Sequence, residues 1–109
     1  MILEVNEANF FSTLDDTIKN EQLVLIDFWA PWCTPCKKFS KILDEINIDL
    51  DHKIVIFKVN TDINVSLARS YNVLSIPCLI LLHNKQVVKR VVGCLSKSEI
   101  RQIIDTYIL

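Results

Sequence analysis

Two cysteines stand three positions apart, at Cys33 and Cys36. They follow an apolar run typical of a strand, residues 23–29, and precede a run with helical periodicity, residues 39–48. On one turn at a helix start, this spacing lets the two sulfurs approach within bonding distance without large backbone movement. The unpaired N–H groups and the positive dipole end of such a helix stabilise a thiolate, which is the nucleophilic form. We therefore expect a redox disulfide, with Cys33 as the nucleophile and Cys36 as the resolving thiol.

The same pair is also half of a zinc site, because closely spaced cysteines are a metal-ligand pattern. No second pair completes a set of four ligands. Cys78 and Cys94 are isolated, and His52 and His83 lie in polar stretches. Redox chemistry is therefore favoured over a structural metal.

Composition limits the classes of protein to which the chain can belong. Its 109 residues predict a single domain, residues 1–109, with one core. Half of the residues are hydrophobic, but no uninterrupted apolar run approaches the ~20 residues of a membrane span. The net charge of −1 is dispersed, so neither nucleic acid nor an anionic membrane is an expected partner.

The cellular compartment is inferred from the start of the chain and from its four cysteines. Residues 1–6 lack the basic segment and the long apolar stretch of a secretory signal. In a reducing compartment, disulfides are usually transient and catalytic. We therefore expect a cytoplasmic monomer.

The elements that must position the dithiol follow from the periodicity of apolar residues. Helical spacing predicts helices within residues 6–20, 36–49, 63–71 and 96–107. Apolar, β-rich runs predict strands at residues 23–26, 54–59, 78–82 and 87–92. The order helix, strand, helix, strand, helix, strand, strand, helix predicts a mixed sheet with helices on both faces, and its central strand leads into the dithiol.

Three local signals refine these elements. Residues 60–62 suit a helix cap, and Ile63, Leu67 and Ala68 would line one face of the short helix that follows. Residues 83–86 connect two antiparallel strands, but no glycine occupies the positions that need positive φ, so a longer or different turn is expected. Ser96 and Glu99 form the pattern of a capping box at the start of the last helix.

Several residues outside the dithiol complete a larger pattern. Asp27 precedes the stretch Trp29-Ala30-Pro31-Trp32-Cys33-Thr34-Pro35-Cys36-Lys37, and Ile76-Pro77 and Val92-Gly93 follow it. With these motifs in this order, the sequence resembles the thioredoxin family nearly from end to end. The resemblance implies the thioredoxin fold, an α/β fold with a central mixed β-sheet flanked by helices on both faces.

The resemblance also implies an activity, protein disulfide reduction by dithiol–disulfide exchange. Cys33 would attack a substrate disulfide, and Cys36 would then attack Cys33 to release the reduced substrate. No metal or organic cofactor is implied. The implied partners are disulfide-containing protein substrates and thioredoxin reductase as the electron donor.

Two charged residues gain a role from the resemblance. It places Asp27 in a buried position behind Cys36, where desolvation would raise its pKa and let it accept the proton of the resolving thiol. The alternative for Asp27 is a solvated acid at a strand end. Lys58 is the matching basic neighbour on the next strand, and its alternative is an outward-facing strand lysine.

The resemblance also outlines a substrate groove. Pro77 would be cis and face the dithiol, so that the backbone of Ile76 can pair with an extended substrate segment. The residues expected to bind substrate are Trp32, Thr34, Pro35, Ile76, Pro77 and Gly93. Most family members have Gly where this chain has Thr34, which we expect to tune the reduction potential of the dithiol. Trp29 is expected to give packing support, whereas the alternative for Trp32 is a core aromatic.

Cys78 and Cys94 fall in segments that border this groove. Free cysteines usually behave as small buried hydrophobes. The alternative is a second redox event at these two thiols. For the whole chain, a disulfide oxidase or isomerase on the same fold and a non-catalytic binding module are the alternatives to the reductase.

Overall fold

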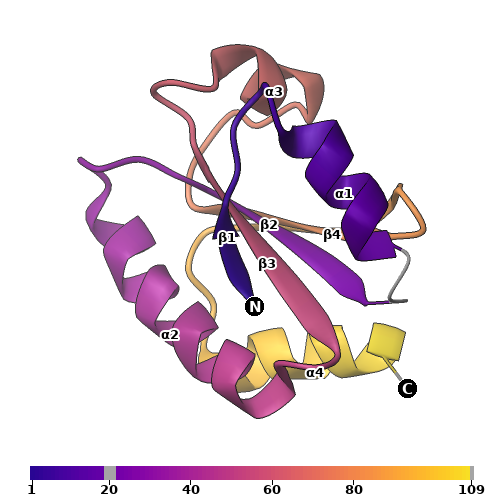
Figure 1. The fold of residues 1–109 in the computed structure, drawn as a ribbon. Coiled ribbons are helices and arrows are strands. Elements are labelled where there is room, and N and C mark those ends of the chain that lie inside the picture. The colour runs from indigo at the N-terminus through magenta and orange to yellow at the C-terminus, as the bar shows by residue number, and fades with distance from the viewer. Residues whose placement is uncertain (19–21, 109) are drawn as a thin grey trace.

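A five-stranded mixed sheet lies between two layers of helices in a computed structural model that describes residues 1–18 and 22–108 (Figure 1). The strands are β1 (Ile2–Glu4), β2 (Leu23–Trp29), β3 (Ile54–Asn60), β4 (Cys78–His83) and β5 (Gln86–Val92). The helices are α1 (Phe10–Ile18), α2 (Thr34–Leu50), α3 (Val65–Ser70) and α4 (Lys97–Ile108). The strand order is β1-β3-β2-β4-β5. The first three of these strands are parallel, whereas β4 is antiparallel to β2 and β5 is antiparallel to β4.

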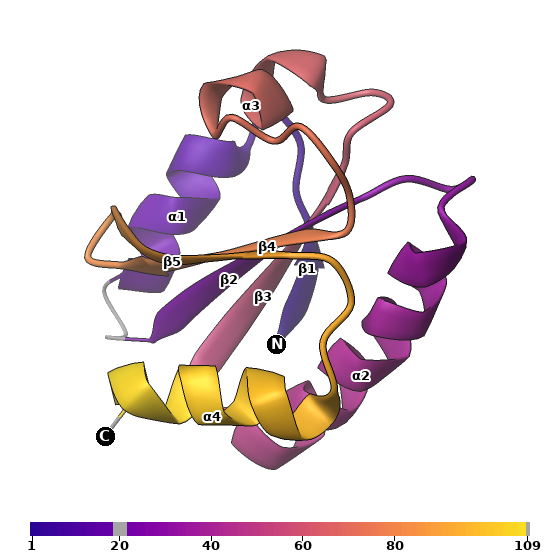
Figure 2. The ribbon, with the colours of Figure 1, turned by 180° about the vertical axis from the view of Figure 1, so that it is seen from behind.

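Strand β2 is the central strand, as the sequence predicted, and it is covered on both faces. Helices α1 and α3 lie on one side of the sheet and α2 and α4 on the other, which the view from behind also shows (Figure 2). Successive side chains of a strand point to opposite faces. Ile26 and Phe28 accordingly belong to the core beneath α1 and α3, whereas Leu23 and Leu25 belong to the core beneath α2 and α4. This strand therefore leads from the middle of the molecule to the start of α2.

The N-terminal region differs from the prediction in two ways. Residues Ile2–Glu4 form a short strand, β1, parallel to β3, which the sequence analysis missed. The first helix begins at Phe10 and not at residue 6, because the side chains of Asn6 and Asn9 form a turn ahead of it. The Asn6 Oδ1 atom accepts the N–H of Asn9 at 3.0 Å, and the Asn9 Oδ1 atom accepts the N–H of Asn6 at 2.8 Å. The expected end of this helix, at residue 20, lies outside the described residues.

Helix α3 is shorter than predicted, and residues 60–62 do not cap it. It begins at Val65, and the Glu7 Oε1 atom accepts the N–H of Leu67 at 3.0 Å from the loop before α1. Leu67 and Ala68 are buried as predicted, but Ile63 is 74% exposed and lies off that face. The cap of α3 therefore comes from a distant part of the chain.

The hairpin between β4 and β5 is a tight two-residue turn, so the expectation of a longer or different turn was wrong. Asn84 and Lys85 both adopt positive φ, at 51° and 68°, and His83 pairs with Gln86 across the turn. Positive φ at both central residues is what a tight hairpin requires. Lys85 Nζ also lies 2.7 Å from Asp15 Oδ1 of α1, which ties the turn to the helix beside it.

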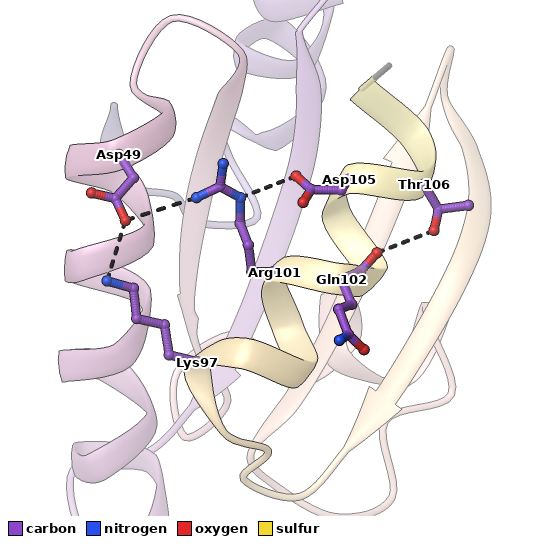
Figure 3. A network of polar contacts seen from close by, with 6 residues as sticks. All are labelled: Asp49, Lys97, Arg101, Gln102, Asp105 and Thr106. Atoms are coloured by element: carbon purple, nitrogen blue, oxygen red, sulfur yellow. Dashed lines mark hydrogen bonds and ion pairs between the residues drawn. The ribbon is translucent and has the colours of Figure 1, made fainter.

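Helix α4 opens with the predicted capping box. The Ser96 hydroxyl accepts the N–H of Glu99 at 3.1 Å, and the Glu99 carboxylate accepts the N–H of Ser96 at 3.3 Å. Charged residues then join α4 to the second half of α2 (Figure 3): Asp49 lies 3.2 Å from Lys97 Nζ and 3.8 Å from Arg101 Nη1. Among residues 1–18 and 22–108, no helix combines the length and the apolar character that crossing a membrane requires.

Candidate active site

The dithiol lies at the start of α2, shortly after β2 ends. Cys33 and Cys36 are joined by a disulfide, with their Cα atoms 5.2 Å apart. Cys33 is the N-cap residue of α2, and its sulfur accepts the N–H of Cys36 at 3.3 Å. A thiolate at Cys33 would keep this hydrogen bond and would lie at the positive end of the helix dipole. In the disulfide form both cysteines are largely covered, with 4% and 3% of their surface exposed.

A small apolar cluster surrounds the two sulfurs. Ala30, Cys33 and Cys36 form its buried part, and Trp29 and Ile76 pack against it. Trp29 thus lies against the dithiol, in the position from which packing support was expected. The Ile76–Pro77 peptide bond is cis, as the resemblance implied.

The turn that contains Pro77 lies beside the end of β5. The Gly93 N–H donates to the Pro77 carbonyl oxygen at 2.9 Å. Gly93 has a φ of 93°, a conformation that favours glycine. Ile76, Pro77 and Gly93, which are distant from the dithiol in sequence, are thus close to one another, and Ile76 reaches the dithiol.

Trp32 is not a core aromatic. Its side chain is 69% exposed, and its Nε1–H donates to Asp62 Oδ1 at 3.0 Å. Trp32 and Ile76 line a cavity of about 430 Å³ whose other walls include Ala68 and Leu74. Trp32 and Ile76 therefore line one cavity, whereas neither Gly93 nor Cys33 lines it. Thr34 and Pro35 are exposed at the start of α2, beside the disulfide.

Asp27 lies in the middle of the sheet and is buried, as the resemblance implied. Only 1% of it is exposed, and its neighbours across the strands are Lys58 on β3 and Leu79 on β4. Burial raises the pKa of this carboxyl to about 6, although the Lys58 ammonium, 3.9 Å from Oδ2, acts in the opposite direction. Within the described residues neither carboxylate oxygen has a hydrogen-bond partner.

Lys58 points inward, toward the dithiol side of the sheet. Its side chain is only 18% exposed, and its Nζ atom lies 5.5 Å from the centre of the Trp29 ring. The same atom donates to the Ser40 hydroxyl at 2.6 Å. The sequence analysis missed Ser40. Its position four residues after Cys36, on the same helix face, is the signal that would have identified it.

A second cavity, of about 280 Å³, lies on the Cys36 side of the dithiol. Trp29, Ala30 and Pro31 form its apolar wall. Polar side chains from the first turns of α2, together with Lys58, form the remaining wall. Cys36 and Lys58 therefore line the same cavity.

The structure does not bring Cys78 and Cys94 together. Cys78 is 1% exposed in the core beneath α1 and α3, whereas Cys94 packs against the opposite core, beneath α2 and α4. Burial raises the pKa of the Cys78 thiol, and Arg90 Nη1 lies 3.8 Å from its sulfur. Cys78 is thus a small buried hydrophobe, and neither thiol is placed to bond to the other. In the described part of the chain, no group of three His, Cys, Asp or Glu side chains is placed to hold a metal ion.

Comparison with known proteins identifies the family. The thioredoxin family model matches residues 1–106. The thioredoxin of Haemophilus influenzae is 38% identical over 107 residues, which are 98% of this chain and 97% of that protein. The thioredoxin of Buchnera aphidicola from Acyrthosiphon pisum is 36% identical over 95% of this chain and 94% of its own length. A bifunctional thioredoxin reductase/thioredoxin of Mycobacterium leprae is 40% identical over 88% of this chain and 20% of that protein.

These matches extend over nearly the whole chain, and the Cys33–Cys36 disulfide occupies the motif on which the resemblance rested. Both observations agree with the mixed sheet and the cis peptide bond at Pro77. The chain belongs to the thioredoxin family and is a thiol–disulfide reductase.

Proposed function

We propose that Cys33 is the nucleophile of this reductase and that Cys36 resolves the mixed disulfide. The observation that carries this assignment is the N-cap position of Cys33, where its sulfur accepts the Cys36 N–H. The Cys33 thiolate attacks one sulfur of the substrate disulfide, that S–S bond breaks, and the first substrate thiolate leaves and takes a proton. Cys36 then loses its proton and attacks the Cys33 sulfur, which releases the second substrate thiolate. The dithiol ends as a disulfide and the substrate as two thiols.

Asp27 is the proposed acceptor of the Cys36 proton. A pKa of about 6 makes the carboxylate a competent base near neutral pH while keeping it close enough to that pH to give the proton up again. Cys36 and Lys58 line one cavity, and Lys58 Nζ lies 3.9 Å from Asp27 Oδ2, which supports a path for this proton past Lys58. Lys58 modulates the carboxylate, because its ammonium group lies 3.9 Å away.

The proposed substrate site is the surface around Trp32 and Ile76. An extended polypeptide would pair with the backbone of Ile76 and place an apolar side chain in the cavity of about 430 Å³. Thr34, Pro35, Pro77 and Gly93 complete this site in the proposal. Thr34 remains the residue expected to tune the reduction potential.

We also propose an electron donor, a class of substrate and a location for this reaction. Thioredoxin reductase is the proposed electron donor, which is supported by the name of the bifunctional Mycobacterium leprae relative. The substrates are proposed to be disulfide-containing proteins. The two cores on one sheet support the single domain predicted for residues 1–109. The cytoplasm and the monomeric state remain predictions.

Insulin reduction tests the assignment of the two thiols. With dithiothreitol as the reductant, catalytic amounts of the protein should accelerate precipitation of the insulin B chain, and Cys33→Ser should abolish the acceleration. Acceleration that survives this substitution would overturn the role of Cys33. Replacing dithiothreitol by NADPH and candidate thioredoxin reductases tests the electron donor. A reduction potential well below that of glutathione separates a reductase from an oxidase.

A further inference from the structure

The charges along α2 are arranged opposite to the order that stabilises a helix. Its first half carries Lys37, Lys38 and Lys41, and its second half carries the acidic residues Asp44, Glu45 and Asp49. Cations near the positive end of a helix dipole are unfavourable. Lys37 and Lys38 thus lie near the unfavourable end of α2, beside the dithiol, and Lys41 follows one turn after Lys37.

Among the described residues, the acidic half of α2 has ion-pair partners at Asp49, whereas the lysines of the basic half have none. Asp49 contacts Lys97 and Arg101 of α4 (Figure 3). In the part of the chain that the structure describes, neither Lys37 nor Lys41 has an ion-pair partner. These two lysines are four residues apart, so they repel each other across one helical turn.

Both lysines line the cavity of about 280 Å³ beside Cys36, and Lys58 lines it from β3. Three lysines therefore line one cavity, and no acidic side chain among the described residues lines it. Ser40 lines it too. Because the Ser40 oxygen accepts a hydrogen bond from Lys58 at 2.6 Å, its own O–H remains available as a donor.

The buried Asp27 carboxylate offsets only part of this charge. It lies 3.9 Å from Lys58 Nζ, but it does not line the cavity. Glu4, opposite Lys58 on β1, and Asp44 also lie near Asp27, but neither of them lines the cavity. An anion in the cavity would relieve the repulsion and would meet several charged donors at once.

We propose that this cavity binds the carboxylate or phosphate group of a small molecule through Lys37, Ser40, Lys41 and Lys58. The volume suits one such group with a short apolar extension, which the wall formed by Trp29 and Pro31 would contact. The site is separate from the groove between Trp32 and Ile76, so a substrate and an anion can be bound together. Binding of the anion does not require turnover of the dithiol.

The test is an NMR titration of the ¹⁵N-labelled disulfide form with inorganic phosphate, with sodium chloride at matched ionic strength as the reference. The amide signals of residues 37–41 and of Lys58 should shift and saturate with phosphate but not with chloride. A second titration with acetate tests a carboxylate probe. Saturation at these residues with either anion supports the site, whereas shifts that are unsaturated or spread over the whole surface with both overturn it.

Substitutions separate this site from general attraction to a basic surface. Lys41→Gln should weaken phosphate binding at least fivefold, and Ser40→Ala at least twofold. Lys38→Gln is the matched control, because Lys38 carries the same charge on the same helix but does not line the cavity. Its affinity for phosphate should stay within twofold of the parent protein. Equal weakening by the two lysine substitutions would overturn the proposal, because it would reduce the effect to general electrostatics.

Discussion

Replacing Asp27 by asparagine should make the folded protein more stable at neutral pH. Burial raises the pKa of Asp27 from 3.8 to about 6, so the folded state binds this proton more tightly than the unfolded state. The stabilisation from proton binding is complete below pH 3.8 and is lost as the pH rises through about 6. Each pKa unit is worth about 1.4 kcal/mol, so the loss amounts to about 3 kcal/mol. The amide that replaces the carboxyl would not titrate, so the variant would not incur this loss.

The measurement is urea denaturation of the disulfide form from pH 4 to pH 7.5. The free energy of unfolding of Asp27→Asn, relative to the parent, should grow by about 2–3 kcal/mol over this range. Glu45→Gln is the control, since Glu45 is exposed on α2, and its difference from the parent should stay within about 0.5 kcal/mol at every pH. A difference for Asp27→Asn that does not change with pH would refute the argument, because it would mean that Asp27 titrates alike in both states. The same variant should also reduce insulin more slowly, because the proposed proton acceptor is missing.

Three further outcomes follow from the site and the fold. Cys36→Ser should accumulate a mixed disulfide at Cys33 that intact-mass spectrometry detects, whereas Cys33→Ser should form none; accumulation in Cys33→Ser alone would exchange the roles of the two thiols, and equal accumulation would show that either thiol can attack. Ser96→Ala should lower the free energy of unfolding by about 1 kcal/mol in urea denaturation, because the capping box loses its hydroxyl; an unchanged midpoint would contradict the contribution of that cap. When the reduced native protein is treated with iodoacetamide, peptide mass spectrometry should find Cys94 alkylated before Cys78, because Cys78 is buried and its thiol pKa is raised; the opposite order would show that the core opens around Cys78.

The parts of the fold that the sequence predicted are those with a strong local pattern. The continuous apolar run of β2 and the capping box at Ser96 depend on residues close in sequence, and both are present. The cap of α3 could not be predicted in this way, since Glu7 lies far from Leu67 along the chain. β1 is only three residues long, which is too short for periodicity to appear.

The hairpin was missed for a different reason. Asn84 and Lys85 do not favour positive φ strongly enough for two successive positive φ angles to be predicted from the sequence. The pairing of β4 with β5 and the contact between Lys85 and Asp15 stabilise the turn from outside it. Tertiary contacts thus stabilise a tight turn that the local sequence disfavours.

The site was predictable wherever a family motif marked it. The dithiol, Asp27 and the Ile76-Pro77 pair were identified from their types and order. Ile76 packs against the dithiol at the start of α2, whereas Asp27 lies buried in the middle of the sheet. Asp62 was not identified as a partner of Trp32, because their contact exists only once separate segments have folded together. The spacing of Ser40 from Cys36 predicts a shared helix face, but not the contact of Ser40 with Lys58. A side chain whose role is to position another side chain has no sequence motif of its own from which that role can be predicted.

The two borders of the sheet bear on how this protein avoids aggregation. On one border β1 offers only three residues, and on the other β5 exposes Lys89 and Arg90. Short or charged borders are poor templates on which another chain can add a strand by accident. The length of β1 and the charges of β5 therefore disfavour edge-to-edge pairing of this sheet with another chain.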